Sequence, residues 1–469
     1  MTDNALNGAA IARYICAARS RVMPTEALEA ARMCLVDWIA VCVGARSEGA
    51  GEHVHTLASS WSIPGHSTLL IGGRSGAIGA ALANGTLAHC LDFDDTYVKA
   101  NTHTSAPLWA ATLALGQEAG ASESEMLSAF LTGFEVAARV GYGLGEAVTA
   151  RGFHATGVFG RIGAAAAGAV LLNLDEQTAQ HALGVAATQA SGLVGSFGTM
   201  SKPFHAGKAA MDGVLSAQLA AVGFRAATGL LEPRGPLASA IIQDRAATIA
   251  PADFTEWEIL NNSFKPYAAC HLTHPAIDAA RSFALSAVEV GRVAKVHAEI
   301  GALAHQITGG KTGAPASSLE GKFDVKYCLA LALHGRPLSA ADFAEPFEPE
   351  PQVLDTAQKV QAIASSSHGY SSAAVTVDFE GGERRRSDIA IAKGHPGNPM
   401  TWDDMRAKLV GLAGASEQTD SLFEALRQFG SNDQKGLRAI ERIGGASHEV
   451  ERPLSAKNPL ASHRSLASR

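Results

Sequence analysis

The stretch TEALEAARMCLVDWIAVCVGA, residues 25–45, sets the pattern for the first half of the chain. Thr25 precedes a stripe of apolar side chains at helical spacing, and Gly44 closes the stripe. Small residues on facing helices allow their backbones to approach closely. Five later segments repeat the periodicity and are rich in Ala, Gly and Leu: 77–92, 124–144, 159–172, 176–195 and 209–224. We therefore expect a compact all-α domain over residues 1–262.

The pattern changes after about residue 263, where apolar and polar side chains begin to alternate. This alternation, in residues 292–303 and 373–382, is typical of β-strands. Gly381-Gly382 predicts a hairpin turn that leads into a partner strand within 383–392. Residues 324–335 have the pattern of a helix. The region 263–398 is therefore predicted to be a smaller α+β domain.

Helical character returns at TWDDMRAKLVGLAG, residues 401–414, where Thr401 and Asp404 have the spacing of a capping box. Residues 399–469 are therefore expected to rejoin the helical domain. The fold class is then mainly α, with an α+β domain inserted into a large helical one. A cleft between two domains is the usual place for a small-molecule site.

Composition narrows the possible partners and the location. The chain has 469 residues, with 38 Lys and Arg against 45 Asp and Glu, a formal charge of −7 that offers no footprint for nucleic acid or an anionic membrane. Its six cysteines are scattered, which favours free thiols in a reducing compartment. The N-terminus lacks a secretory pattern, and the apolar run 157–172 contains Arg161 and is too short to span a bilayer. We expect a cytoplasmic protein with no nucleic acid or membrane partner.

Three stretches contain no acidic residue and yet hold basic groups: 147–174, 177–211 and 259–277. Gathered in a partly dry cleft, such cations would bind a carboxylate far more strongly than in open water. The alternative is chance clustering on solvated helix faces. The basic residues of these stretches include Arg151, His154, Arg161, Lys202, His205, Lys208, Lys265, His271 and His274.

The segment LDFDDTYVKANTHTS, residues 91–105, places Asp92, Asp94 and Asp95 within four positions and His103 shortly after them. Short acids often cap helices, and this reading suits Asp94 and Asp95. The spacing matches neither an EF-hand nor an HExxH motif, and CHLTH (270–274) has no second Cys/His pair at zinc-finger spacing. We therefore expect no metal site.

Glycine-rich segments could suggest a nucleotide cofactor, but their spacing does not fit one. Residues 72–85 lack a GxGxxG fingerprint, and HAGKAA (205–210) lacks the Ser or Thr of a P-loop.

Three histidines, His103, His154 and His274, lie in joints between helices, short segments that contain Gly, Pro or Thr. Such joints often present catalytic groups, although a structural, hydrogen-bonded histidine is equally compatible with each position.

Six segments together resemble the successive signatures of the MmgE/PrpD family: LDFDDTY…HTS (91–105), GFHATGVFGRIGAAAA (152–167), GTMSKPFHAGKAAMDG (198–213), SFKPYAACHLTHPAIDA (263–279), EGKFDVKY (320–327) and GNPMTWDDMRAKL (397–409). That family includes 2-methylcitrate dehydratase, cis-aconitate decarboxylase and iminodisuccinate epimerase. The resemblance implies a large helical domain with a smaller α+β lid domain. It also implies a homodimer that needs neither metal nor cofactor.

The resemblance further implies a set of site residues: Asp92, Thr96, His103, His154, Lys202, Lys265 and Tyr327. Lys202 and Lys265 would bind substrate carboxylates. His103 and His154 would transfer protons, since histidine titrates nearest neutral pH.

The remaining members of the set would orient and enclose the substrate. Asp92 would act with Thr96 to orient a base or the substrate, and Tyr327 would close the site from the lid. Four more residues are candidates for substrate binding: Lys208, Cys270, His271 and His274.

The chain departs from the family pattern in two places. Position 270 is Cys where the resemblance implies a catalytic histidine in the decarboxylases, and HTS stands where HPS is usual, with Lys99 adding a cation that no motif explains. We therefore expect a hydro-lyase like 2-methylcitrate dehydratase that acts on a small di- or tricarboxylate. An epimerase of a substituted succinate, a decarboxylase and a non-catalytic carboxylate-binding protein are the alternatives.

Overall fold

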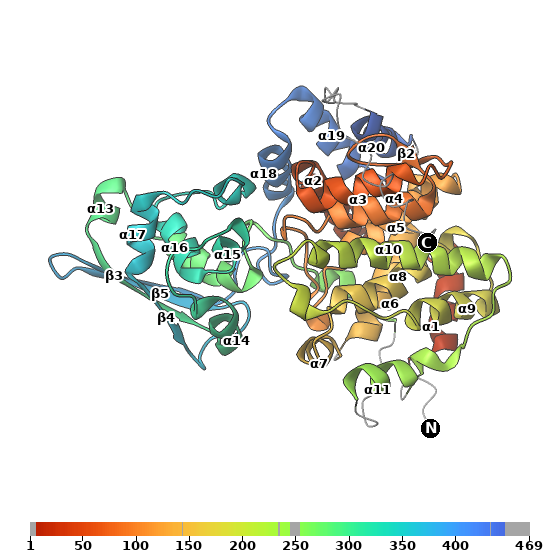
Figure 1. The fold of residues 1–469 in the computed structure, drawn as a ribbon, viewed down its shortest axis with the longest axis horizontal. Helices are drawn as coiled ribbons and strands as arrows, with labels where there is room; N and C mark the ends of the chain where they lie inside the picture. The colour runs from red at the N-terminus through yellow and green to blue at the C-terminus, as the bar shows by residue number, and fades with distance from the viewer. Residues whose placement is uncertain (1–5, 143, 233–234, 244–253, 432, 446–469) are drawn as a thin grey trace, which may run out of the picture.

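A computed structural model describes residues 6–142, 144–232, 235–243, 254–431 and 433–445. The chain is mainly helical, which confirms the predicted class (Figure 1). Within the described ranges, no helix combines the length and apolarity that a membrane span needs. All six cysteines lie in these ranges, and none forms a disulfide.

The first part of the chain forms a helical body. Its helices are α1 (Gly8–Cys16), α2 (Thr25–Gly44), α3 (Gly49–Ser60), α4 (Ala77–Leu87), α5 (Ser105–Glu118), α6 (Glu123–Gly141), α7 (Gly145–Ala150), α8 (Ala155–Leu171), α9 (Glu176–Ala187), α10 (Ser201–Ala221) and α11 (Pro236–Ile242). A short antiparallel pair, β1 (Ser67–Thr68) and β2 (Arg74–Ser75), precedes α4. Helix α2 covers the segment from Thr25 to Gly44 that the sequence pattern marks.

Small residues bring these helices close together, as the sequence predicts. A Cβ atom added to Gly133 of α6 would lie 2.6 Å from the carbonyl oxygen of Gly163 of α8, and the reverse distance is the same. A Cβ added to Gly85 of α4 would lie 2.8 Å from Gly207 Cα of α10. Neither crossing leaves room for a larger side chain, so glycine sets the separation of the helices.

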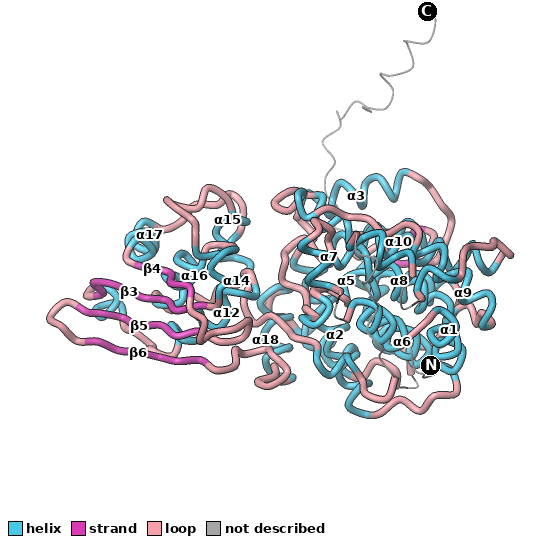
Figure 2. The backbone as a smooth tube through the Cα atoms, turned by 90° about the horizontal axis from the view of Figure 1, so that it is seen from below, coloured by secondary structure: helices cyan, strands magenta, loops and turns pink. Residues whose placement is uncertain are grey.

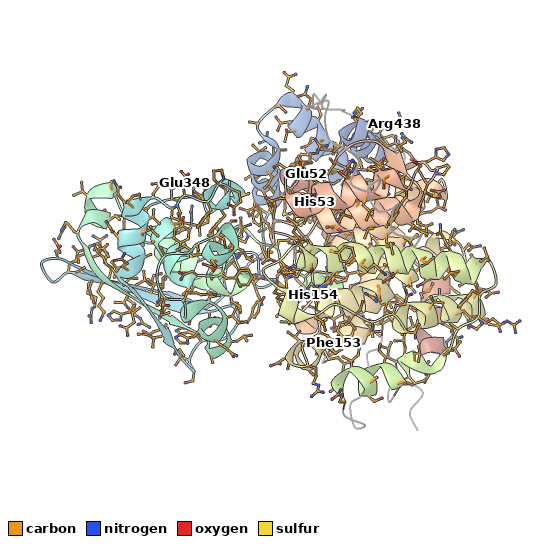
Figure 3. All side chains as sticks on the ribbon, in the orientation of Figure 1. Glu52, His53, Phe153, His154, Glu348 and Arg438 are labelled. Atoms are coloured by element: carbon orange, nitrogen blue, oxygen red, sulfur yellow. The ribbon has the colours of Figure 1, made fainter. Side chains whose placement is uncertain are left out.

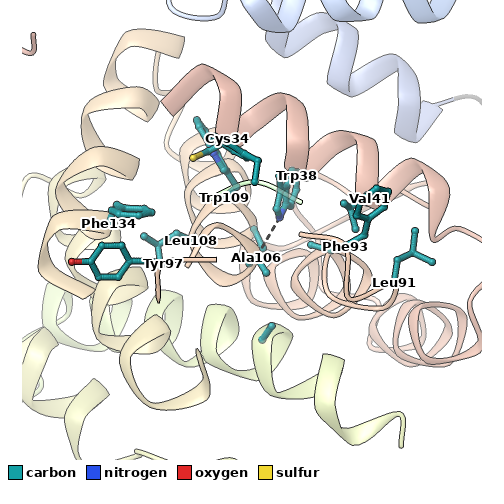
Figure 4. Close-up of a cluster of buried hydrophobic side chains, with 14 of the residues drawn as sticks. Cys34, Trp38, Val41, Leu91, Phe93, Tyr97, Ala106, Leu108, Trp109 and Phe134 are labelled. Carbon is teal, nitrogen blue, oxygen red and sulfur yellow. Dashed lines mark hydrogen bonds between the residues drawn. The ribbon is translucent and has the colours of Figure 1, made fainter. Parts of the chain in front are cut away.

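Aromatic side chains fill the centre of the helical body (Figure 4). Trp109 stacks on Phe130 with ring centroids 4.2 Å apart. The indole nitrogen of Trp38 donates a hydrogen bond of 3.2 Å to the Ala106 carbonyl, so its one polar atom is satisfied inside the core. Helices α2 and α5 are thereby fixed to each other next to the loop that carries Asp92.

The second part of the chain, termed here the sheet lobe, runs from α12 to β6. It comprises α12 (His274–Arg281), α13 (Ala287–Gly291), β3 (Val293–Ile300), α14 (Ala302–Ala304), α15 (Ser318–Lys322), α16 (Val325–Leu333), α17 (Pro351–Gln358), β4 (Val360–Ala364), β5 (Ala373–Phe379) and β6 (Arg384–Ile389). The strand order is β4-β3-β5-β6 (Figure 2). Strands β3, β5 and β6 pair antiparallel, and β4 joins β3 in parallel.

The alternating segments become strands, and Gly381-Gly382 turns between β5 and β6 with φ of 91° and 88°, as predicted. Strand β4 is not evident from alternation. It is only five residues long, and after the buried Val360 its side chains are largely exposed. Its place is therefore set by backbone pairing with β3.

Three C-terminal helices return to the helical body: α18 (Trp402–Ala413), α19 (Glu417–Arg427) and α20 (Lys435–Gly445). Thr401 and Asp404 form the predicted capping box of α18. Helices α18 and α19 pack on α2 (Figure 1). Helix α20 reaches β1. The boundaries 1–262, 263–398 and 399–469 stay predictions, as does the action of the sheet lobe as a lid.

Candidate active site

The loop between α4 and α5 carries a carboxylate that two lysines contact. Asp92 has a positive φ of 53°, a left-handed conformation that aspartate tolerates better than most residues. Its Oδ1 accepts from Lys202 Nζ at 2.7 Å and from Lys265 Nζ at 3.2 Å. Lys265 Nζ also donates to the Asp92 carbonyl at 2.6 Å. Residues far apart in the sequence therefore meet at Asp92.

These three groups are buried and charged. Burial by itself would raise the pKa of Asp92, but Lys202 and Lys265 outweigh that effect and hold it well below its usual range. Burial would lower the pKa of Lys265, and Asp92 reverses this and raises it. The result is a buried cluster with more positive than negative charge, as a carboxylate-binding site requires.

A third buried lysine, Lys322 at the end of α15, adds to this charge. Its Nζ donates to the Leu91 carbonyl at 3.1 Å, next to Asp92 in the chain. Burial lowers the pKa of Lys322, while the charge of Asp92 pulls it back up. The sheet lobe thus contributes one of the cations of the site.

Asp94 connects two histidines on the other side of the loop. Its carboxylate accepts from His89 Nδ1 at 2.9 and 3.0 Å and lies 3.3 Å from His103 Nδ1. His103 Nδ1 also lies 2.9 Å from the Asp95 carbonyl, and its Nε2 is 3.8 Å from Asp92 Oδ1. His103 thus presents its second nitrogen to the lysine cluster.

His154 precedes α8 at the edge of the helical body nearer the sheet lobe (Figure 3). Its ring lies nearly parallel to that of His89, with centroids 5.7 Å apart, and its Nδ1 is 3.1 Å from His205 Nδ1. Burial, with the nearby His89 and Lys202, holds the pKa of His154 well below its ordinary value. His154 is therefore neutral at physiological pH.

Asp95 and Lys99 have structural environments. Asp95 accepts from the Asn262 side chain at 2.7 Å and from the Ser105 hydroxyl, so it holds the start of α5 against a later segment. Lys99 pairs with Glu258 at 3.0 Å, and its side chain is 40% exposed. The cation that the motif does not explain therefore belongs to the surface and not to the site.

Thr96 connects the acidic loop to the segment of Lys265. Its backbone pairs with Ser263 in both directions, at 2.8 and 3.0 Å. Its hydroxyl oxygen is buried and has no hydrogen-bond partner among the described residues. A role for this hydroxyl in binding substrate stays a prediction.

Three of the predicted binding residues lie side by side after Lys265. Burial raises the pKa of the Cys270 thiol to about 11, so the thiol stays protonated. His271 is buried, with its ring 5.4 Å from that of Tyr370 of the sheet lobe. His274 is fully buried, and its Nε2 lies 3.2 Å from the Ala269 carbonyl, which suits a structural role better than substrate binding.

The structure does not bring two predicted residues to this cluster. Lys208 forms an ion pair with Asp212, and its side chain is 35% exposed. The ring of Tyr327 packs edge-on against Phe343 and Phe347 within the sheet lobe, and neither contact reaches Asp92. A role for Tyr327 in closing the site stays a prediction.

Sequence reasoning missed three residues of the cluster: His89, Lys322 and Tyr370. His89 stands three positions before Asp92, and Lys322 lies inside the quoted segment 320–327, so both had a signal in the sequence. Tyr370 lies in the loop between β4 and β5 and has no such signal. Only the tertiary structure brings it next to His271.

The side chains of His89, Asp92, Asp94 and His103 place possible ligand atoms within 4.8 Å of one another. However, Asp92 Oδ1 already accepts from two ammonium groups. A divalent cation here would face both positive charges at close range. The charge distribution therefore favours an anionic ligand over a metal ion.

Comparisons with known proteins agree with the arrangement of the chain. The model of the MmgE/PrpD N-terminal domain matches residues 9–249, and that of the MmgE/PrpD C-terminal domain matches residues 267–443. The two models together span most of the chain, one on each side of the change in sequence pattern near residue 263.

Curated relatives cover similar lengths. The chain is 27% identical to cis-aconitate decarboxylase of Aspergillus terreus over 427 residues, 84% of this chain and 86% of the relative. It is 25% identical to cis-aconitate decarboxylase-like protein oryM of Aspergillus oryzae over 461 residues, 90% and 94% of the two chains. Human cis-aconitate decarboxylase is 31% identical over 211 residues, 43% of this chain and 44% of the relative. The chain belongs to the MmgE/PrpD family.

Proposed function

We propose that this protein is a lyase that acts on a small di- or tricarboxylate by moving a proton at a carbon beside a carboxylate. The observation that carries the proposal is the set of three buried lysines, Lys202, Lys265 and Lys322, around Asp92. Cations in a site of low dielectric bind carboxylates and stabilise enolate-like charge as it develops. The sheet lobe, which supplies Lys322, would complete the site as a lid when substrate binds.

In this proposal, His103 and His154 transfer the proton. Both Nδ1 partners of His103, the Asp95 carbonyl and Asp94, are acceptors, so its Nδ1 carries the hydrogen and its Nε2 is free to take a proton. His154 is neutral, as its depressed pKa requires. A neutral imidazole next to fixed ammonium groups provides a base and electrostatic stabilisation in one site.

The first candidate reaction is decarboxylation of an unsaturated tricarboxylate, because the curated relatives are cis-aconitate decarboxylases. The bond to the departing carboxylate breaks, CO₂ leaves, and the electron pair stays on carbon. An imidazolium or ammonium of the site then delivers a proton to that carbon. The product is a dicarboxylate.

The second candidate is dehydration of a hydroxy-tricarboxylate, as in 2-methylcitrate dehydratase. The observation that favours it is Cys270, a buried, protonated thiol beside Lys265 at the position where the resemblance implies a catalytic histidine in decarboxylases. Here a base removes the proton beside a carboxylate, the C–O bond breaks, and the hydroxyl leaves with a second proton as water.

One assay separates these reactions. The protein is incubated in D₂O with cis-aconitate and, separately, with 2-methylcitrate, and the products are followed by NMR and by CO₂ release. Decarboxylation gives CO₂ and a deuterated dicarboxylate, and dehydration gives a new alkene without CO₂. Exchange of one C–H without net change indicates an epimerase. Binding of an acid with neither exchange nor product would overturn the proposal in favour of a carboxylate-binding protein.

Paired lysine variants test the site itself. Lys202→Met removes a buried ammonium from Asp92, and turnover should fall about 100-fold or more. Lys208→Met, six residues further along α10, removes a partly exposed ammonium from the buried Asp212, which keeps Arg161 at 3.4 Å, and should change turnover by less than about fivefold. Similar losses of turnover in both variants would show that the Asp92 cluster does not take part in the reaction. A homodimer and the absence of a cofactor stay expectations from the family resemblance.

A further inference from the structure

The carboxylate of Asp94 is shared between two imidazoles. His89 Nδ1 lies 2.9 and 3.0 Å from its two oxygens, and His103 Nδ1 lies 3.3 Å from one of them. The rings of the two histidines are 4.6 Å apart. Asp94 is almost fully buried, so water cannot take the place of either donor.

The partners fix the tautomer of each histidine. Asp94 is ionised, because the imidazoles of His89 and His103 outweigh the burial that would otherwise raise its pKa, and hold that pKa well below the usual range. A carboxylate only accepts hydrogen bonds, so each Nδ1 facing it carries a hydrogen. The Nε2 of each ring is then a lone-pair acceptor while the ring is neutral.

The two histidines differ in their surroundings. His89 is fully buried, its Nε2 has no hydrogen-bond partner among the described residues, and burial lowers its pKa to about 4. The side chain of His103 is 15% exposed and faces Asp92. His89 therefore remains a neutral donor to Asp94, and His103 is the member of the pair that faces the lysine cluster.

We propose that His89 is a positioning residue that shares Asp94 with His103 and so keeps His103 a weaker base than an undivided Asp94 would make it. The proposal rests on the proposed function only in taking His103 as a proton-transfer group. A base that holds its proton too strongly cannot return it to the product, so a divided carboxylate suits a residue that must accept and release a proton in one turnover.

Other charged and titratable groups face this pair from the elements packed around it and would remain in place when His89 is changed. They are Asp92 and Asp95 of the same loop, Asp37 of α2, His154 before α8, Lys202 of α10, Lys265 and His271 of the segment before α12, and Lys408 of α18. The Thr156 hydroxyl accepts from the His103 amide at 3.0 Å and holds its backbone. A change in the protonation of His103 on substituting His89 can therefore be assigned to Asp94.

The test compares two substitutions of nearly equal size. His89→Asn keeps an N–H donor close to the Nδ1 position, and His89→Leu removes it. Protonation of His103 is followed by NMR of ¹³C-labelled histidine in the protein without ligand, with its signal assigned by loss in His103→Gln. We expect the midpoint to move up by about one pH unit in His89→Leu and to stay nearly unchanged in His89→Asn. Asp94→Asn should move it down.

Equal midpoints in the wild type and His89→Leu would overturn the proposal, as would equal shifts in His89→Leu and His89→Asn. If His89→Leu does not fold, His89→Gln replaces it, because its longer side chain moves the donor away from Asp94. A purely structural role would change stability without moving the midpoint. In a turnover assay, the acidic limb of the kcat/KM profile should follow the NMR midpoint. The NMR result stands even if no substrate is found, so the two proposals fail separately.

Discussion

At the scale of single residues, burial changes the protonation of several histidines. His89, His154, His271 and His274 all lie inside the protein, and burial lowers the pKa of each. A buried histidine stays neutral in the folded chain at pH values where the unfolded chain already binds a proton. That extra proton stabilises the unfolded chain relative to the folded one. Buried histidines therefore make the fold sensitive to acid.

His274 provides a test of this sensitivity. Burial lowers its pKa to about 3, against an ordinary value of 6.5. Between these pH values the unfolded chain binds more protons, so stability is complete above pH 6.5 and falls as the pH drops towards 3. His274→Gln keeps an N–H donor to Ala269 and cannot titrate, so its free energy of unfolding should fall less between pH 7.5 and 5, by on the order of 1–2 kcal/mol.

Urea unfolding at the two pH values measures the difference. His53→Gln is the matched control because His53 is exposed, and it should keep the pH dependence of the wild type. An unchanged slope in His274→Gln would mean that His274 does not contribute to acid lability.

At the scale of elements, the crossing of α4 and α10 positions the site. Helix α4 leads into the loop of Asp92, and α10 begins with Ser201 and Lys202. A Cβ added to Gly207 would collide with the Thr86 hydroxyl and the Leu82 carbonyl of α4. The distance between the two helices, and with it the Lys202–Asp92 ion pair, depends on glycine at this position.

Gly207→Ala should therefore push the two helices apart. We expect a loss of about 1–3 kcal/mol in the free energy of unfolding, together with reduced turnover. Gly411 is also helical, in α18, and an added Cβ there meets nothing within 4 Å. Gly411→Ala should stabilise the chain by about 0.5–1 kcal/mol without affecting turnover. Denaturant unfolding and steady-state kinetics on both variants check this, and a stable, active Gly207→Ala protein would contradict it.

At the scale of the whole molecule, one lysine joins the returning C-terminus to the site. Lys408 of α18 is buried and contacts Asp37 Oδ1 of α2 at 2.6 Å, the Phe93 carbonyl at 2.7 Å and the Lys265 carbonyl at 3.0 Å. Burial lowers its pKa, while Asp37 pulls it back up. A single ammonium thus ties together three parts of the chain.

Lys408→Met leaves the Asp37 carboxylate buried without its cation. We expect a loss of about 3–5 kcal/mol in the free energy of unfolding. Hydrogen exchange should be faster at the Asp95 amide, which donates to Asp37 at 3.1 Å. Arg406, also on α18, forms a half-exposed pair with Asp420 of α19, and Arg406→Met should lose less than about 1 kcal/mol. Similar losses in both variants would show that the bridge does not hold the parts together.

The sequence by itself determined the class of the fold and its order. Helical periodicity, alternation and caps are local signals, so α2, β3, β5 and the start of α18 follow from neighbouring residues. The Asp92 motif and the stretches without acidic residues also indicated a carboxylate site. Charge and motif name Lys202 and Lys265 independently, whereas Asp92 comes from the motif alone, and the roles of all three stay predictions.

Only the tertiary structure decided what each group contacts. Lys202 and Lys208 are six residues apart on one helix, and packing against α4 sends one to Asp92 and leaves the other at the surface. Lys322 reaches the Leu91 carbonyl across 231 positions, and Tyr370 meets His271 across the fold. His89 contacts the nearby Asp94, and Tyr327 packs within its own lobe. Burial and charge pairing depend on these distances, which no local pattern encodes.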